Sequence, residues 1–97
     1  MKPCKRIEIV IEEPLMERMA NLLRDLGAPG YTVLQRVSGM GDRGLRRADE
    51  PTGTATNCVF IIACDPAAVD ALVAGIRPML SKFGGVCLVS DAHWLRH

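Results

Sequence analysis

The stretch that decides the fold is CVFIIAC, residues 58–64. Seven consecutive apolar residues predict a strand buried inside a sheet. Asp65 and Pro66 follow at once. This pair is typical of a helix start, because the aspartate supplies an oxygen acceptor at the cap and proline fits the first turn. The sequence therefore predicts a buried strand that leads directly into a helix.

Downstream of residue 65, the pattern predicts a helix that ends at Gly84-Gly85. Its apolar positions follow helical spacing and comprise Val69, Leu72, Val73, Ile76, Leu80 and Phe83. Pro78 lies inside this stripe, where proline costs about 3 kcal/mol or kinks the helix. Val86–Val89 then predicts a short fourth strand, and we interpret 91–97, which holds the only tryptophan, as a polar tail.

Upstream, periodicity is lost from Ser38 to Asn57, and we expect a long flexible loop at about 38–57. Before this loop, the alternation of apolar and polar residues over 31–37 predicts a strand. A helical apolar stripe over 14–26, closed by Gly27, predicts the first helix. Alternating isoleucines over 6–12 predict the first strand.

The resulting element order is β-α-β-β-α-β. It is the order of the ferredoxin-like α+β fold, an antiparallel sheet with two helices on one face. We expect the 97 residues to form a single domain, 1–97. The fold by itself does not specify an activity, since many functions share it.

Composition excludes several classes of protein. The chain is 48% hydrophobic and 24% charged with a net charge of +1, which fits a folded domain and disfavours a nucleic-acid binder that needs a broad basic field. No run approaches the roughly 18 apolar residues of a membrane span, and the first residues lack an apolar signal region. The sequence has four cysteines without two-residue spacing and two histidines, so we expect reduced, buried thiols in the cytosol and no metal centre.

Two glycine-containing segments are candidates for ligand binding. In GMGDRGLRR, residues 39–47, glycines leave backbone N–H groups free to face an anion and arginines add donors suited to phosphate. The segment matches neither a Walker loop nor a Rossmann fingerprint, and a solvated charged loop is the alternative interpretation. Gly84-Gly85 either admits a ligand closely or simply stops a helix. No catalytic constellation is present, so we expect no enzymatic activity.

Beyond these patterns, the chain resembles PII signalling proteins. Gly30-Tyr31-Thr32-Val33 followed by Gly39-Met40-Gly41 is similar to their second strand and loop base. The element order, the position of the long loop and a glycine turn before the last strand also correspond. The chain looks closest to the short PII-like proteins associated with inorganic-carbon uptake and carboxysomes, which have a similar Gly-Tyr-Thr-Val strand and a shortened loop with arginine.

This resemblance implies a non-catalytic, cytoplasmic homotrimer that binds adenine nucleotide in the clefts between subunits and requires no cofactor. It further implies bicarbonate as a second ligand and a protein partner that docks on the loop, such as a bicarbonate transporter or a carboxysome component. By position, Thr32 lines the base end, and the other nucleotide-binding residues are Gly39, Met40, Gly41, Arg43, Arg46, Gly84, Gly85 and Arg96.

The departures from typical members refine the expected ligand. Asp42-Arg43 stands where they have Arg-Gln, so we do not expect 2-oxoglutarate sensing. Val86 follows Gly85 where they have a lysine for the distal phosphates, and its absence favours ADP or AMP over ATP. The stretch from Thr32 to Gly39 is one residue longer than in typical PII members. The alternatives are a trimeric metal-tolerance protein of the CutA kind and an acylphosphatase-like enzyme, although the early arginine loop of acylphosphatase is absent.

Overall fold

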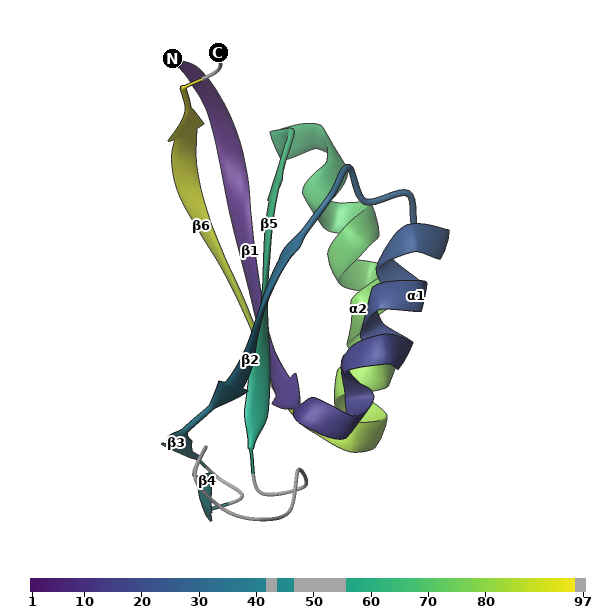
Figure 1. Cartoon of the computed structure of the whole chain (residues 1–97). Coiled ribbons are helices and arrows are strands. Elements are labelled where there is room, and N and C mark those ends of the chain that lie inside the picture. The colour runs from purple at the N-terminus through teal and green to yellow at the C-terminus, as the bar shows by residue number, and fades with distance from the viewer. Residues whose placement is uncertain (42–43, 47–55, 96–97) are drawn as a thin grey trace.

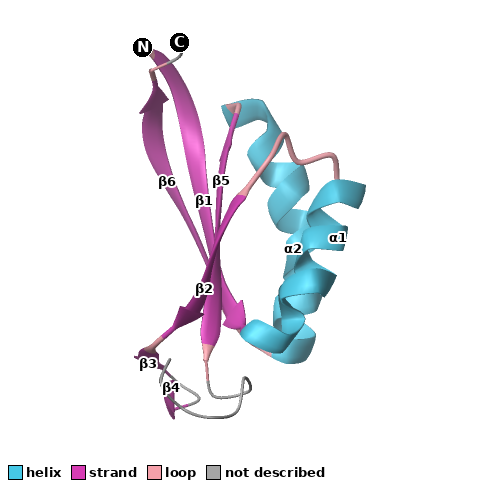
Figure 2. Cartoon of the chain, in the orientation of Figure 1, coloured by secondary structure: helices cyan, strands magenta, loops and turns pink. Residues whose placement is uncertain are grey.

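Four strands and two helices form the main body of the chain in a computed structural model that describes residues 1–41, 44–46 and 56–95. The strands are β1 (Lys2–Glu12), β2 (Thr32–Val37), β5 (Asn57–Cys64) and β6 (Val86–Trp94), in the sheet order β2-β5-β1-β6. Every neighbouring pair is antiparallel. The helices α1 (Met16–Asp25) and α2 (Val69–Phe83) cover one face of the sheet (Figures 1 and 2). This arrangement confirms the predicted ferredoxin-like fold.

The core lies between the two helices and the inner face of the sheet. Strand β1 contributes the predicted alternating isoleucines, and the other buried side chains of the core cluster are Met19, Leu23, Cys58, Phe60, Ile62, Cys64, Leu72 and Ile76. Only alternate residues of β5 are buried, although its sequence is continuously apolar. Its outward residues therefore belong to a second apolar surface, on the opposite face of the sheet.

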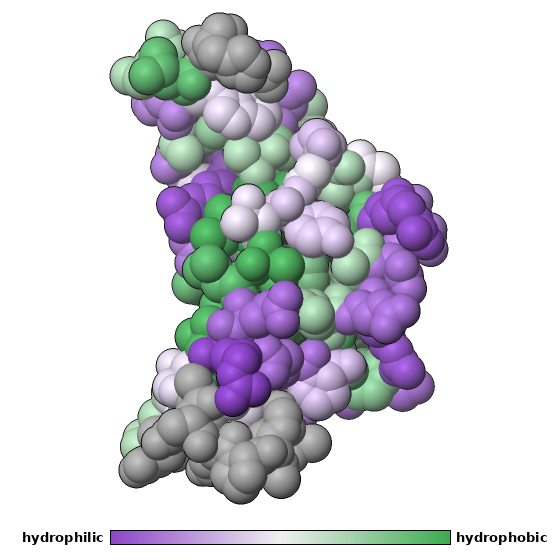
Figure 3. All heavy atoms as spheres, in the orientation of Figure 1, coloured by the Kyte–Doolittle hydropathy of each residue, from purple (hydrophilic) through white to green (hydrophobic). Residues whose placement is uncertain are grey.

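That second surface is a row of four side chains that crosses the whole sheet. The strand register aligns Leu34 of β2, Val59 of β5, Val10 of β1 and Val86 of β6. Leu34 is 49% exposed, Val86 is 50% exposed, and Leu88 on the same face is 56% exposed. Figure 3 shows hydrophobic residues gathered at mid-height over the strands. We call the row together with Ile61 and Leu88 the outer apolar face.

The neighbouring strands β1 and β6 are longer than the sequence pattern predicts. β1 begins at Lys2 rather than residue 6, and β6 continues to Trp94, so the prediction of a polar tail from residue 91 was wrong for 91–94. The register pairs Lys2 with Trp94 and Lys5 with Asp91, and an ion pair joins the latter two side chains. Backbone ladder bonds need no apolar side chains, which explains why alternation did not reveal this extension. In Figure 1 the two strands end together at the chain termini.

Both helices are preceded by a short 3-10 turn that begins beside a proline. The turns are η1 (Glu13–Leu15) and η3 (Pro66–Ala68). The predicted side-chain cap from Asp65 does not form; its carboxylate pairs instead with Lys2 at 3.2 Å. Helix α2 runs through Pro78 without interruption. Within the described residues, the helices fall short of the length and apolar character that crossing a bilayer requires.

The connection between β2 and β5 has more regular structure than the sequence suggests. β3 (Gly39–Gly41) and β4 (Gly44–Arg46) pair as a small antiparallel sheet, so the expectation of a loop throughout 38–57 was wrong for these residues. A glycine-rich ladder has no side-chain alternation, and for this reason it leaves no sequence signal. The remainder of the predicted loop, residues 42–43 and 47–55, lies outside the described residues.

Candidate functional site

The first predicted binding segment lies at the β2 edge of the sheet. Gly39, Met40 and Gly41 form β3, and the register places Gly39 opposite Arg46 of β4. The structure thus brings two of the predicted phosphate-binding elements together. Met40 is 78% exposed. Arg43 lies outside the described residues.

The second predicted segment, Gly84-Gly85, joins α2 to β6 at the opposite edge of the sheet. Both glycines have positive φ, 85° and 129°. A Cβ atom on Gly85 would lie 2.8 Å from the backbone oxygen of Val10 and 2.9 Å from Cγ2 of Ile11. The turn therefore packs directly onto the end of β1, where a larger residue does not fit.

The two segments share one end of the sheet but not one edge. β2 ends opposite Asn57, which pairs with Glu12 at the end of β1, and the Gly84-Gly85 turn precedes Val86 opposite Val10. Three strand spacings, about 14 Å, separate the two edges. Thr32 begins β2 opposite Ile61 and is exposed, and Arg96 lies outside the described residues. One chain therefore does not surround a small ligand with both segments.

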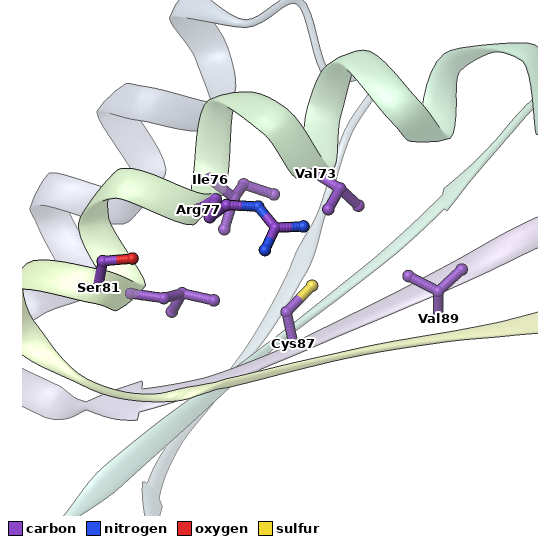
Figure 4. Close-up of a pocket in the computed structure, with 7 residues that line it drawn as sticks. Val73, Ile76, Arg77, Ser81, Cys87 and Val89 are labelled. Atoms are coloured by element: carbon purple, nitrogen blue, oxygen red, sulfur yellow. The ribbon is translucent and has the colours of Figure 1, made fainter.

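A pocket of about 350 Å³ lies between α2 and the edge strand β6, next to the glycine turn. Its apolar lining consists of Val73, Ile76, Leu80, Cys87 and Val89, and its polar groups are Arg77 and Ser81. In Figure 4 the Arg77 guanidinium extends from α2 over the space above Cys87, whose sulfur points toward the helix. An apolar cleft with a few polar groups is the usual form of a small-molecule site, and this volume is at the small end of the range.

Burial and charge both act on the Cys87 thiol inside this pocket. Burial raises its pKa, and the positive charge of Arg77 opposes that shift. Burial also raises the pKa of Cys58 to about 11, with a further contribution from the Glu13 charge. The pKa of Cys64 is raised chiefly by burial too. All four thiols are free, and Cys87 alone among them is less than fully buried.

Two further cations stand beside the glycine turn. The Arg18 guanidinium and the Lys82 ammonium lie 4.9 Å and 5.2 Å from the ring centre of Phe83, the last residue of α2. Such cation–π contacts hold charged groups over an aromatic face. Together with Arg77, they place positive charge near the C-terminal end of α2, where the helix dipole is otherwise unfavourable to an anion.

Sequence patterns did not single out Arg77, Arg18 or Glu13. Arg77 has a detectable signal, because it is four residues from both Val73 and Ser81 and therefore shares their face of the helix. Arg18 and Glu13 gain their roles from tertiary placement alone. Within the part of the chain that the structure describes, no three histidine, cysteine or acidic side chains gather where a metal ion would bind.

Comparison with known proteins identifies relatives along the whole chain. The model of the family described as nitrogen regulatory protein P-II matches residues 4–97. CPII, a nitrogen regulatory PII-like protein from Thiomonas intermedia K12, solved bound to ADP, AMP and bicarbonate, is 28% identical with a TM-score of 0.85, and the match covers 97% of this chain and 90% of that one.

Two more distant structures share the fold. A PII-like signalling protein from Thermus thermophilus is 18% identical with a TM-score of 0.78, and the match covers 94% of this chain and 88% of that one. The GlnK–ATP complex of B. subtilis is 21% identical with a TM-score of 0.67, covering 95% and 84%. The sequence-based assignment to PII-like proteins is confirmed.

Proposed function

Because the chain belongs to the nitrogen regulatory protein P-II family and is a PII-like regulatory protein, we propose that it is a non-catalytic sensor that binds adenine nucleotide between subunits. In this proposal Gly39–Gly41 of one subunit and Gly84-Gly85 of its neighbour contact the same nucleotide. The nucleotide orders the connection between β2 and β5, which then selects the partner that can dock.

The placement of the two glycine segments is the observation that carries this proposal. They lie at the same end of the sheet and at opposite edges, as two halves of a site shared by neighbouring copies must. The α2–β6 pocket lies at one of those edges, and its apolar walls suit a purine ring while Arg77 suits an anionic group. CPII from Thiomonas intermedia, solved with ADP and AMP, supports the class of ligand.

The outer apolar face supports assembly into a homotrimer. Its central row crosses all four strands, and several of its side chains are half exposed in the single chain. A patch of this kind on a small domain marks an interaction surface. Packing three such faces together buries them and brings the β2 edge of one copy next to the β6 edge of another, which completes the proposed cleft.

Within the adenylates, ADP and AMP are the favoured ligands. Val86 supplies no charge after the glycine turn, and the cations closest in sequence are Lys82, held over Phe83, and Arg77 in the pocket. A third phosphate would therefore lack the partner that a desolvated anion needs. We assign Arg43 and Arg46 to phosphate binding and Thr32 to the base end of the cleft. Arg96 belongs to the same proposed set.

Bicarbonate and inorganic-carbon metabolism complete the proposal. CPII was solved bound to bicarbonate as well as to adenine nucleotides. In this chain, backbone N–H groups near the loop base and an arginine supply donors for such an anion. The partner that we expect is a bicarbonate transporter or a carboxysome component in the cytoplasm. If isothermal titration shows the same nucleotide affinity with and without bicarbonate, coupling between the two ligands is absent.

A thermal-shift panel of AMP, ADP, ATP and cyclic AMP tests the nucleotide assignment. At 100 times its dissociation constant a ligand stabilises the folded protein by about 2.7 kcal/mol, and we expect ADP and AMP to reach this before ATP. Replacing Arg43 and Arg46 together by alanine should weaken ADP binding without changing the oligomeric state. Arg24→Ala, at an exposed arginine on α1, is the matched control. Absence of stabilisation by all four nucleotides would contradict the proposal.

A further inference from the structure

A single carboxylate bonds both sides of the connection between β2 and β5. Glu13 lies in η1, directly after β1. Its Oε1 accepts a hydrogen bond from the Arg36 backbone N–H at 2.7 Å, and its Oε2 accepts one from the Thr56 hydroxyl at 2.9 Å. The Glu13 backbone N–H also donates to the Thr56 carbonyl at 3.0 Å. Glu13 thereby links the end of β2 to the residue before β5.

The bonded part of β2 is a bulge. Leu34 pairs with Val59 and Val37 pairs with Asn57, so that Gln35 and Arg36 together face the single residue Cys58. Arg36 has φ 58°, and among the described residues it is the one non-glycine with positive φ. A bulge inserts one residue into a strand, so this part of β2 carries one residue more than the part of β5 that it faces.

The location of the bulge makes it decisive for the residues that follow. A register change of one position turns every subsequent side chain to the other face of a strand. Without the bulge, each side chain in residues 37–41 would point to the face opposite to the one it occupies now. Met40 would therefore point to the other side of β3. The left-handed conformation at Arg36 is unfavourable for a residue with a Cβ, so it needs compensating bonds. Glu13 accepts one such bond from the Arg36 N–H itself. It also accepts a hydrogen bond from Thr56, the fully buried residue that directly precedes β5.

We propose that Glu13 is a positioning residue for the nucleotide site: by holding the β2 bulge, it sets the direction in which Gly39–Gly41 meet the ligand. This inference rests on the proposed function. In this proposal Glu13 affects ADP affinity through the backbone of β2 and without a direct contact to the nucleotide.

The test compares three variants at Glu13 and Thr56 by two measurements, hydrogen exchange of the Arg36 amide and ADP affinity by calorimetry. Glu13→Ala removes both acceptors, and we expect Arg36 exchange to accelerate at least 100-fold and ADP to bind at least tenfold more weakly. Glu13→Gln retains one oxygen for the Arg36 N–H and a group that can donate to the Thr56 hydroxyl, so we expect a loss below threefold. Thr56→Val keeps the shape of the side chain without the hydroxyl. We expect its Arg36 exchange rate and its ADP affinity to lie between those of Glu13→Ala and Glu13→Gln. Glu17→Ala, which removes an exposed carboxylate from α1, is the control.

A rescue experiment separates positioning from general stability. Glycine adopts positive φ without strain. Arg36→Gly in the Glu13→Ala background should therefore recover at least threefold of the lost ADP affinity, whereas Arg36→Ala in the same background should recover none. This comparison removes the arginine side chain in both cases and changes only the backbone preference.

The outcomes are distinguishable. Unchanged exchange of the Arg36 amide in Glu13→Ala would show that Glu13 does not hold the bulge, which overturns the proposal. Faster exchange with undiminished ADP affinity would show that Glu13 has a structural role alone, which also overturns it. If Glu13→Ala does not fold, Thr56→Val and Glu13→Gln decide the same two questions. If the unmodified chain binds no adenylate, the proposed function fails and the positioning role fails with it, while Arg36 exchange still reports whether Glu13 holds the bulge.

Discussion

The two glycine segments at opposite edges of the sheet need glycine for different reasons. At Gly85 a Cβ would lie within 3.0 Å of β1 and φ is 129°, so the chain's own packing demands glycine. At Gly39 a Cβ would meet no heavy atom within 4 Å, and φ is in the range open to any residue. The fold of the single chain explains the first glycine and leaves the second without an internal cause.

This difference separates structural from functional glycines. A glycine whose Cβ would touch its own chain is accounted for by stability, whereas the open space at Gly39 leaves room for a ligand at the predicted loop base. The contrast supports Gly39 as a ligand contact and assigns Gly85 mainly to holding the edge of β6. Substitutions at the two positions should therefore affect different quantities.

The largest effect is expected for Gly85→Ala. The new Cβ would clash with the Val10 carbonyl, and the alanine would have to adopt a φ that is unfavourable for it. The two costs together should lower the free energy of unfolding by about 3 kcal/mol. Urea denaturation measures this loss. Gly27→Ala is the matched control, because Gly27 has φ 78° but open space around it and should cost only about 1 kcal/mol. Equal losses in both variants would show that contact with β1 is unimportant.

A second substitution tests whether the two segments act across a subunit boundary. Leu88→Asp places a charge on the outer apolar face, and we expect it to dissociate the proposed trimer and weaken ADP binding about 100-fold, or about 2.7 kcal/mol. Light scattering and calorimetry measure the two effects. Leu95→Asp, at an exposed leucine beyond β6, should change neither. A monomer that still binds ADP normally would place the whole site within one chain.

Sequence patterns predicted the inner face of this fold well, because side-chain alternation reports burial directly. Ile7, Ile9 and Ile11 have period two and are all buried. The polar ends of β1 and β6 and the glycines of β3 have no such pattern, since backbone pairing between distant segments forms those strands. The elements missed are those that main-chain pairing forms without an alternating apolar pattern.

The candidate site was predicted in the same uneven way. Resemblance to a family supplied the glycines and arginines, whose types and order can be compared directly along a sequence. Glu13 and Arg77 were missed because their roles depend on where η1 and α2 meet other elements. A carboxylate that bonds residues 36 and 56 has no local signature, since its partners are 23 and 43 positions away.

A smaller effect is expected for Gly39→Ala, the counterpart of Gly85→Ala. With open space around the new Cβ, unfolding free energy should change by no more than about 0.5 kcal/mol. ADP affinity should fall about tenfold, equivalent to about 1.4 kcal/mol, because the methyl group occupies space needed by the ligand. Gly30→Ala also has open space but lies before β2, and it should alter neither quantity. Unchanged ADP affinity in Gly39→Ala would remove the functional half of the comparison.

The smallest effect, and the most direct probe of the Gly85 side of the cleft, is protection of Cys87 from alkylation. Burial raises the pKa of this thiol, so its reactive thiolate is scarce at neutral pH and should increase about tenfold per pH unit between pH 7 and 8. Iodoacetamide labelling, read by mass spectrometry, should modify Cys87 before Cys58, whose pKa is about 11. Arg77→Met should slow Cys87 further, because removing the positive charge raises the pKa again and lowers the thiolate fraction.

Saturating ADP should slow Cys87 labelling by about threefold to tenfold if the nucleotide fills the α2–β6 pocket and limits access to the sulfur. Adenosine is the informative companion ligand. It lacks phosphate, so equal protection by adenosine and ADP would place the base in the pocket, whereas protection by ADP alone would place the phosphates there beside Arg77. Because Cys87 and Gly85 lie two residues apart at one edge, unaltered labelling with ADP bound would mean that the ligand leaves this edge empty, and Gly85 would then serve the fold alone.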